Sequence, residues 1–264
     1  MAHTPHGLLL ALGLGSVLWV STMGQSYDGV VESLKVLRGC GFQPSSILDV
    51  GANMGYWTKS VKGVFPTANF FMVEGNSFHE DSLKKTGTPY SIALLGAHEG
   101  NVTFYRYPQK GVSATGNSVF METTGVFSES MRVRLPLSTL DNLMIKNNIS
   151  GTTWELAKFD IQGSELAAIR GGHITLSKTE VLVTEAPVHN YNSGAPTLLH
   201  LYHHLHGLGF SPFDCVDLSR NNKKILIQMD ILWVRRSSSL WNESCTTYPR
   251  RNKMTIAEHP PHPR

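Results

Sequence analysis

The hydrophobic and polar positions of the chain alternate between two periodicities. Short apolar runs rich in β-branched and aromatic residues indicate buried strands, and between them apolar residues recur at helical spacing. The runs predict strands over residues 47–50, 69–74, 89–94, 154–161, 180–185 and 225–234. The spacing predicts helices over residues 28–42, 56–64, 77–86, 163–172 and 196–209. This order is typical of an α/β fold with an open, doubly wound and mostly parallel sheet.

Residues 98–150 interrupt this order. Two segments of alternating polarity within them, residues 101–107 and 131–137, are predicted to pair as a β-hairpin around the Gly-, Ser- and Thr-rich stretch 111–120. Segments inserted into a rigid scaffold commonly carry recognition. We therefore expect this insertion to contribute the surface that selects a substrate.

Length and composition predict one folded domain between two terminal segments. A chain of 264 residues with 41% hydrophobic content can bury one substantial core, and we place the domain at residues 25–250. Residues 7–20 are apolar and uncharged but too short to span a bilayer, which predicts a signal peptide or a short signal anchor over residues 1–24. No Lys or Arg precedes this run, so a buried N-terminal helix is the alternative. Residues 251–264 are expected to form a disordered tail.

The sequons and cysteines bear on the cellular compartment. Three N-glycosylation sequons begin at Asn101, Asn148 and Asn242. The three cysteines allow at most one internal disulfide, whose pairing stays open, and their spacing matches no metal site; they are Cys40, Cys215 and Cys245. Together with the apolar N-terminal run, the sequons predict the secretory pathway, either the Golgi lumen or secretion. Membrane contact is expected only through the N-terminal anchor.

Charge and histidine spacing argue against two classes of partner. The 23 basic and 20 acidic residues nearly balance, without a long basic block, so no nucleic-acid partner is expected. His200 and His204 lie four residues apart on a predicted helix, which is one spacing for a metal site. No matching carboxylate accompanies them. A solvated helix face explains them better, and no metal is expected.

Four predicted strands end in an acid. Asp49, Glu74, Asp160 and Glu185 each close an apolar run. In a parallel sheet these ends meet at one edge, where ligands bind near the point at which the strand order reverses. The four acids therefore predict a lined pocket, although helix capping is an alternative for each of them.

The turn after the first of these strands indicates a nucleoside cofactor. Its pattern is Asp49-x-Gly51-x-x-x-Gly55, which lacks the third glycine of a dinucleotide fingerprint and places a carboxylate where a diphosphate would be repelled. S-adenosylmethionine carries no phosphate and presents an ammonium and a sulfonium, so the acid would attract it. Glu74, 25 residues later, suits the hydroxyls of a ribose in either kind of cofactor. A tight turn without a ligand is the structural alternative.

Several further segments occur in a familiar order: DVGANMGYWT, VEGN, SIAL, STLD, KFDIQGSELAAIRGG, VLVTEAP and LGF. In this order and spacing they resemble the FkbM family of S-adenosylmethionine-dependent methyltransferases, over residues 45–235. The most specific segment, KFDIQGSE, is similar to the family's K-x-D-(I/V)-(E/Q)-G-x-E. Two residues depart from the commoner pattern, because Gly75 stands where Pro is common and Gln162 where Glu is common.

The resemblance implies a class I methyltransferase (Rossmann-like) fold with a seven-stranded sheet, and S-adenosyl-L-methionine as cofactor. It also implies transfer to a hydroxyl oxygen, often on a sugar or polyketide. The residues that it assigns to the cofactor are Asp49, Gly51, Ala52, Asn53, Gly55, Tyr56, Glu74, Ala93 and Asp160.

The catalytic candidates lie around Asp160 and after Glu185, the third and fourth of the acidic strand ends. Alternation places Lys158, Asp160 and Gln162 on one side of their strand, and Asp160 is the preferred general base. A buried Lys158–Asp160 pair that merely holds the strand end is the structural alternative for Lys158. Glu165 and His189 are second choices as base. Glu165 also suits a helix start, and His189 lies on a loop with Tyr191.

We expect an S-adenosylmethionine-dependent O-methyltransferase that acts on a hydroxyl-bearing small molecule, carbohydrate or glycan. Two alternatives remain open from the sequence. A secreted binding protein would keep the fold without turnover, and an NAD-dependent oxidoreductase would need the glycine that the turn lacks. Binding of the cofactor, or of its demethylated product, separates these hypotheses.

Overall fold

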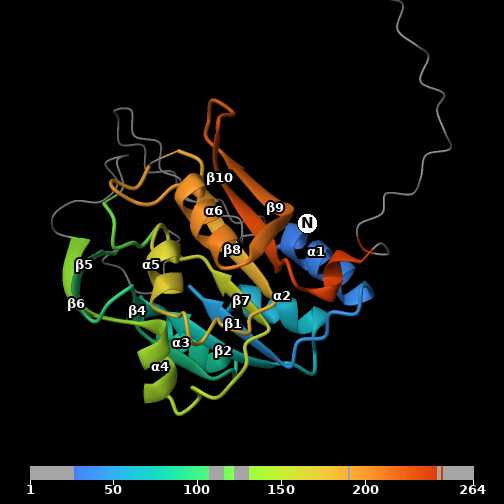
Figure 1. The fold of residues 1–264 in the computed structure, drawn as a ribbon. Coiled ribbons are helices and arrows are strands. Elements are labelled where there is room, and N and C mark those ends of the chain that lie inside the picture. The colour runs from blue at the N-terminus through green and yellow to red at the C-terminus, as the bar shows by residue number, and fades with distance from the viewer. Residues whose placement is uncertain (1–26, 107–115, 122–130, 190, 243–244, 246–264) are drawn as a thin grey trace, which may run out of the picture.

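The computed structural model describes residues 27–106, 116–121, 131–189, 191–242 and 245. A seven-stranded sheet forms its centre (Figure 1). The strands, in spatial order, are β3 (Tyr90–Ile92), β2 (Asn69–Glu74), β1 (Ser46–Val50), β7 (Leu156–Phe159), β8 (Val181–Pro187), β10 (Leu226–Arg235) and β9 (Phe210–Arg220). All neighbours pair in parallel except β10, which is antiparallel to both β8 and β9. The strand order reverses between β1 and β7, as in a doubly wound fold.

Helices cover both faces of this sheet. One face packs against α1 (Asp28–Gly39) and α2 (Tyr56–Val64), in a core that contains Leu34, Trp57 and Ile47. The other face packs against α4 (Leu140–Lys146), α5 (Glu165–Arg170) and α6 (Leu198–Gly207). Alternate residues of β1 enter the two cores, since Ile47 belongs to the first and Leu48 to the second. The remaining helices are η1 (Ser77–His79), α3 (Glu80–Lys85) and η3 (Ser239–Trp241).

A second sheet of three strands confirms the predicted hairpin. β5 (Gly100–Tyr105) and β6 (Arg132–Ser138) pair antiparallel, and the short β4 (Leu94–Leu95) pairs in parallel with β6. The chain leaves the main sheet after Ile92 to form β4, so the predicted strand over residues 89–94 is divided between the two sheets. Much of the stretch 111–120 lies outside the described residues.

The predicted elements are present, and three described elements were not predicted, namely β9, α4 and the short η3. The first is β9, an edge strand whose side chains are mostly exposed or half-buried, so it lacks the apolar run that marked the inner strands. The second is α4, whose seven residues are too few for a clear helical period. The single strand predicted over residues 225–234 is half of the hairpin formed by β9 and β10.

A disulfide joins the two ends of the described chain. Cys40, just after α1, bonds to Cys245, beyond η3, with their Cα atoms 5.8 Å apart. This settles the pairing that the sequence left open, and Cys215 is a free, exposed cysteine. The predicted N-terminal segment 1–24 and the tail 251–264 lie outside the described residues. Within the described ranges, no helix is both long and apolar enough to cross a membrane.

Candidate active site

The turn after β1 brings three strand ends together. Gly51 has a φ of +84° and Gly55 a φ of +83°, a backbone conformation that suits glycine. A Cβ atom on Gly51 would lie 1.8 Å from the carbonyl oxygen of Asp160, so only glycine lets β1 end against β7. The N–H groups of Gly51 and Ala52 both donate to the carbonyl of Val73 in β2, at 2.9 and 3.0 Å.

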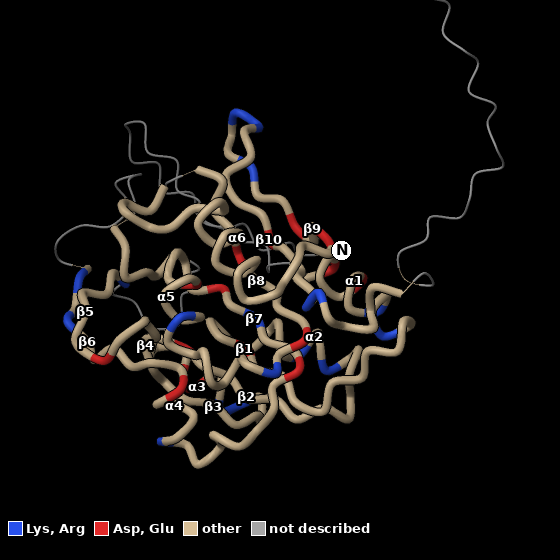
Figure 2. Tube along the Cα trace, in the orientation of Figure 1, with Lys and Arg blue, Asp and Glu red and all other residues tan. Residues whose placement is uncertain are grey.

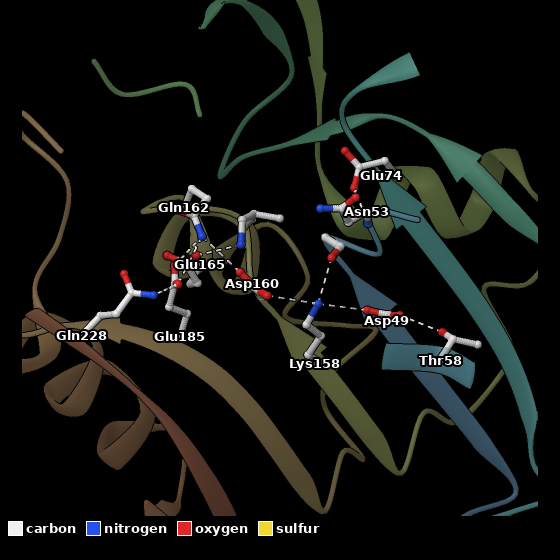
Figure 3. Close-up of polar contacts among 12 residues, drawn as sticks. Asp49, Asn53, Thr58, Glu74, Lys158, Asp160, Gln162, Glu165, Glu185 and Gln228 are labelled. Atoms are coloured by element: carbon white, nitrogen blue, oxygen red, sulfur yellow. Dashed lines mark hydrogen bonds and ion pairs between the residues drawn. The ribbon is translucent and has the colours of Figure 1, made fainter. Parts of the chain in front are cut away.

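Lys158 joins two carboxylates behind this turn. Its Nζ lies 3.3 Å from Asp49 Oδ1 and 3.4 Å from Asp160 Oδ2, and donates to the carbonyl of Gly51 at 2.8 Å (Figure 3). Thr58 in α2 donates to Asp49 Oδ2 at 2.7 Å. Burial alone would lower the pKa of Lys158, but the two carboxylates outweigh it and hold that pKa above its ordinary value. Lys158 is therefore charged and is the counter-ion of both acids.

Glu74, at the end of β2, holds the turn from the other side. Its carboxylate accepts the N–H of Asn53 and the N–H of Asn76, each at 2.7 Å. Burial raises the pKa of Glu74, and these two hydrogen bonds oppose the rise. Asn53 has a φ of +50°, and its side-chain Oδ1 is buried without a hydrogen-bond partner among the described residues. A buried amide oxygen of this kind is suited to receive a donor from a ligand.

A second group of acids lies on the far side of Asp160. The Gln162 side-chain amide donates to Asp160 Oδ1 at 3.3 Å and to the two carboxylate oxygens of Glu185 at 3.0 and 3.1 Å. Gln228 of β10 also donates to Glu185, and Tyr191 donates to Gln228. Asp230 is the register partner of Glu185 across β8 and β10. Figure 3 shows this group extending from Asp160 away from Lys158.

These acids bind protons more readily than free carboxyls. Burial is the main cause for each of them, and the nearby charge of Asp160 adds to it. The pKa of Glu165 is raised to about 7 and that of Asp230 to about 8. The pKa of Glu185 is raised well above its ordinary value. Figure 2 shows Lys and Arg also at the β9–β10 turn, where the sequence has Arg220, Lys223 and Lys224.

The four acids predicted at strand ends do lie at one edge of the sheet. Glu165, the first residue of α5, is buried and accepts the N–H of Ile161 at 2.8 Å and that of Gly163 at 3.0 Å, so its carboxylate holds the loop that precedes the helix. His189 is exposed, and its backbone N–H donates to the carbonyl of Ile227 at 3.1 Å. The structure therefore brings Glu165, but not the His189 side chain, into the buried group.

The remaining predicted residues surround the turn. Tyr56, the first residue of α2, is 53% exposed. Ala93 donates its N–H to the carbonyl of Glu74 at 2.9 Å, so it lies beside the end of β2.

His200 contacts Thr197 at the start of α6, where it completes a capping box. Within the described residues, no group of His, Cys, Asp and Glu is arranged to hold a metal ion.

The sequence analysis missed three residues of this region. Gln228 and Asp230 are polar positions two apart in an otherwise apolar strand, which is a signal that both face the same polar neighbours. Tyr27, just before α1, is also close: burial raises its pKa, and the charges of Lys158, Asp160 and Asp49 act on it. No pattern in the sequence links Tyr27 to the strand ends.

Comparisons with known proteins agree with this arrangement. The family model of the methyltransferase FkbM domain matches residues 49–212, more than half of the chain. No curated protein matches the chain. A precorrin-6y C5,15-methyltransferase from Geobacter metallireducens GS-15 is 13% identical, with a TM-score of 0.45 over 84% of this chain and 94% of that chain. An O-methyltransferase from Bacillus cereus is 12% identical, with a TM-score of 0.46 over 81% of this chain and 83% of that chain. These two structures are too distant to inform on the substrate.

The matched region contains the glycine turn, all four strand-end acids and the segment from Lys158 to Glu165. The seven-stranded sheet, with β10 as its antiparallel member, is the class I methyltransferase sheet that the resemblance implied. The chain belongs to the FkbM family and is an S-adenosylmethionine-dependent methyltransferase.

Proposed function

We propose that the protein transfers a methyl group to a hydroxyl oxygen, on a carbohydrate, glycan or other hydroxyl-bearing small molecule, with Asp160 as general base. The observation that carries the proposal is the position of Asp160. Its side chain is 17% exposed at the end of β7, and it lies between a buried cation and a side-chain amide. Glu165 and Glu185 are more deeply buried.

S-adenosylmethionine supplies a methyl group on a sulfonium, so the chain has to position the methyl acceptor and take its proton. Asp160 would receive the hydroxyl proton as the acceptor oxygen bonds to the methyl carbon and the methyl–sulfur bond breaks, which leaves neutral S-adenosylhomocysteine. Lys158 is the counter-ion of the Asp160 carboxylate and holds it in place. A base of this kind commonly contributes about 10²–10⁴-fold to the rate.

The residues at the turn fit the nucleoside and amino acid parts of this cofactor. Each carboxylate oxygen of Glu74 accepts one N–H and retains a lone pair for a ribose hydroxyl. The unpaired Oδ1 of Asn53 is a further acceptor beside them. Gly51, Ala52, Gly55, Tyr56 and Ala93 complete the proposed surface.

Asp49 has a different position in this proposal. Its carboxylate is fully buried between Thr58 and Lys158, so direct contact with the cofactor's ammonium requires it to turn outward. That contact stays a prediction.

The test is transfer of a labelled methyl group from S-adenosylmethionine to a panel of glycans and small alcohols. We expect Asp160→Asn to lower the rate by about 10² or more and to leave binding of S-adenosylhomocysteine, measured by calorimetry, within a few-fold. Normal turnover by Asp160→Asn together with loss in His189→Ala would place the base on the loop instead. Absence of binding by the unaltered protein would favour the binding-protein alternative, and binding of NAD would favour the oxidoreductase.

We also propose that the protein resides in the secretory pathway, in the Golgi lumen or outside the cell. The support is the apolar run at residues 7–20, the Cys40–Cys245 disulfide, and exposed side chains at all three sequon asparagines, Asn101, Asn148 and Asn242. Endoglycosidase treatment of protein from its native host should increase its electrophoretic mobility. A full-length cytosolic protein whose mobility does not change would contradict the proposal.

A further inference from the structure

Gln162 is the point at which three separate segments of the chain meet. It has a φ of +54°, a left-handed conformation that glutamine rarely adopts, and it lies three residues after the end of β7. Its side chain points into the acid group, while its backbone carbonyl faces the other way, toward two loops. The contacts on these two sides are independent of each other.

The side chain of Gln162 connects two carboxylates. Its Nε2 lies 3.3 Å from Asp160 Oδ1 and 3.0 and 3.1 Å from the oxygens of Glu185. An amide nitrogen carries two N–H donors, so it can serve both acids at once. A glutamate at this position would add a third acceptor and remove the donors.

The backbone of Gln162 is held by the insertion and by the loop after β8. Its carbonyl accepts the hydroxyl of Ser118 at 2.7 Å and the side-chain amide of Asn192 at 3.1 Å. Both of these residues are buried. Ser118 is joined in turn to β5 through two backbone hydrogen bonds with Tyr105, at 2.8 and 3.1 Å.

The neighbouring residue, Gly163, packs closely against the same two segments. Gly163 has a φ of +102°, and a Cβ atom there would lie 2.9 Å from the Cβ of Ala195 and 3.2 Å from the ring of Phe120. The insertion also bonds directly to the loop after β8, because Ser193 donates its N–H to the carbonyl of Met121 at 2.9 Å. The left-handed backbone at residues 162–163 is thus enclosed by both segments.

We propose that Gln162 is a positioning residue of the methyl-transfer site, which holds Asp160 and Glu185 through its amide and is itself held by Ser118 and Asn192. The proposal rests on the proposed function, since it gives Gln162 a role toward Asp160. A methyl acceptor that contacts Ser118 or Asn192 therefore acts on the base through Gln162. It also explains why glutamine suits this chain: an amide donates to acids that a glutamate would repel.

The decisive variant is Gln162→Asn. Asparagine tolerates a left-handed backbone better than glutamine does, so the fold is kept, but its side chain is one methylene too short to reach both acids. Gln162→Glu keeps the length and removes the donors. Ser118→Ala removes one anchor of the backbone carbonyl and leaves the amide in place.

The first measurement is the titration of the Glu185 carboxyl carbon by ¹³C NMR, with its signal assigned from Glu185→Gln. The acids around Glu185 are Asp160, Glu165 and Asp230, all of which raise its pKa, and the Gln162 amide lowers it. We expect Gln162→Asn and Gln162→Glu each to raise the pKa of Glu185 by about one pH unit, a tenfold change in proton affinity. An unchanged titration in both variants would overturn the proposal.

The second measurement separates positioning from a merely structural role. With the best methyl acceptor from the panel, we expect kcat to fall about tenfold or more in Gln162→Asn, less in Ser118→Ala, with S-adenosylhomocysteine affinity within threefold of the unaltered protein. A shifted Glu185 titration with unchanged kcat would overturn the positioning role. If Asp160→Asn turns over normally, the proposed base is wrong, yet the NMR titration still decides whether Gln162 holds Glu185.

Discussion

The two halves of the site differ in how their acids are compensated. The turn half comprises Asp49 and Glu74, at the ends of β1 and β2. Asp49 faces the ammonium of Lys158 and the hydroxyl of Thr58, and Glu74 accepts two backbone N–H groups. The other half, which we call the carboxyl half, comprises Glu165 at the start of α5, Glu185 in β8 and its register partner Asp230 in β10. Neutral amides are the side-chain donors to Glu185.

The turn half is therefore a prearranged surface, whereas the protonation of the carboxyl half depends on pH. In the turn half, the donors are backbone groups of the turn itself and a cation that also bonds to Gly51, so the acids and the turn fix each other. In the carboxyl half, charge accumulates without a cation of its own, and burial raises the pKa values of its acids. Asp160 lies between the halves, with Lys158 on one side and Gln162 on the other.

The largest effect on the two halves is expected from removing Lys158, the cation that Asp49 and Asp160 share. Lys158→Met keeps the length of the side chain and leaves Asp49 and Asp160 without a counter-ion, so we expect the free energy of unfolding to fall by about 3–5 kcal/mol. Denaturant unfolding measures this change. The control is Lys84→Met, which removes an exposed partner of Glu80 and should leave stability close to that of the unaltered protein.

A second substitution tests whether the lost stability is electrostatic. Adding Asp49→Asn to Lys158→Met removes one of the two uncompensated charges, and the double variant should be more stable than Lys158→Met alone. If the double variant is less stable, the stability lost in Lys158→Met does not come from the uncompensated charge of Asp49.

The next largest effect is expected from Glu74→Ala in the turn half. The substitution removes hydrogen bonds to a charged group, each worth about 1.5–3 kcal/mol, so affinity for S-adenosylhomocysteine should fall tenfold or more. Calorimetry measures the affinity, and Glu80→Ala, at an exposed position in α3, is the matched control. Unchanged affinity in a folded Glu74→Ala variant would mean that this acid serves only the turn.

The pH dependence of stability tests the description of the carboxyl half. The pKa of Asp230 is raised to about 8 in the folded protein from an ordinary value of 3.8, so the folded state holds a proton that the unfolded state releases. Stability therefore falls as the pH rises between these values. The stability advantage of Asp230→Asn over the unaltered protein should therefore grow by about 1 kcal/mol or more between pH 5 and pH 9.

Glu99 provides a control of opposite sign for this measurement. Hydrogen bonds from Thr139, Asn142 and Ser138 lower its pKa to about 2, so its stabilising contribution is lost only as the pH falls from its ordinary value of 4.5 through 2. Glu99→Gln should therefore leave the slope between pH 5 and pH 9 unchanged. Equal slopes in Asp230→Asn and the unaltered protein would show that the carboxyl half does not titrate as described.

The smallest effect is expected from Thr58→Val, which removes the hydroxyl donor of Asp49 and keeps the shape of the side chain. Because Lys158 still neutralises Asp49, we expect a loss of about 1–2 kcal/mol in the free energy of unfolding. A loss as large as that of Lys158→Met would mean that the hydroxyl, rather than the cation, is the main partner of Asp49.

The sequence predicted the inner sheet and the strand-end acids because both follow from short-range patterns. An apolar run that ends in Asp49 or Glu185 is visible in a few neighbouring residues, and the glycine turn has a fixed spacing. The contacts of Gln228 and Tyr27 are different, because they depend on which strands and helices become neighbours. Asp230 was missed for the same reason: it meets Glu185 only because β10 inserts beside β8. The short helix α4 has too few residues for its period to be read.

The Cys40–Cys245 bond also constrains how the chain is made. The two cysteines are 205 residues apart, so Cys40 leaves the ribosome long before its partner, and Cys215 emerges in between. Any oxidation of Cys40 during that interval joins it to the wrong thiol and must be reversed by exchange. The correct bond closes only after both strands of the last hairpin have been synthesised. It is therefore a late event in biosynthesis, which seals a finished domain rather than guiding its assembly.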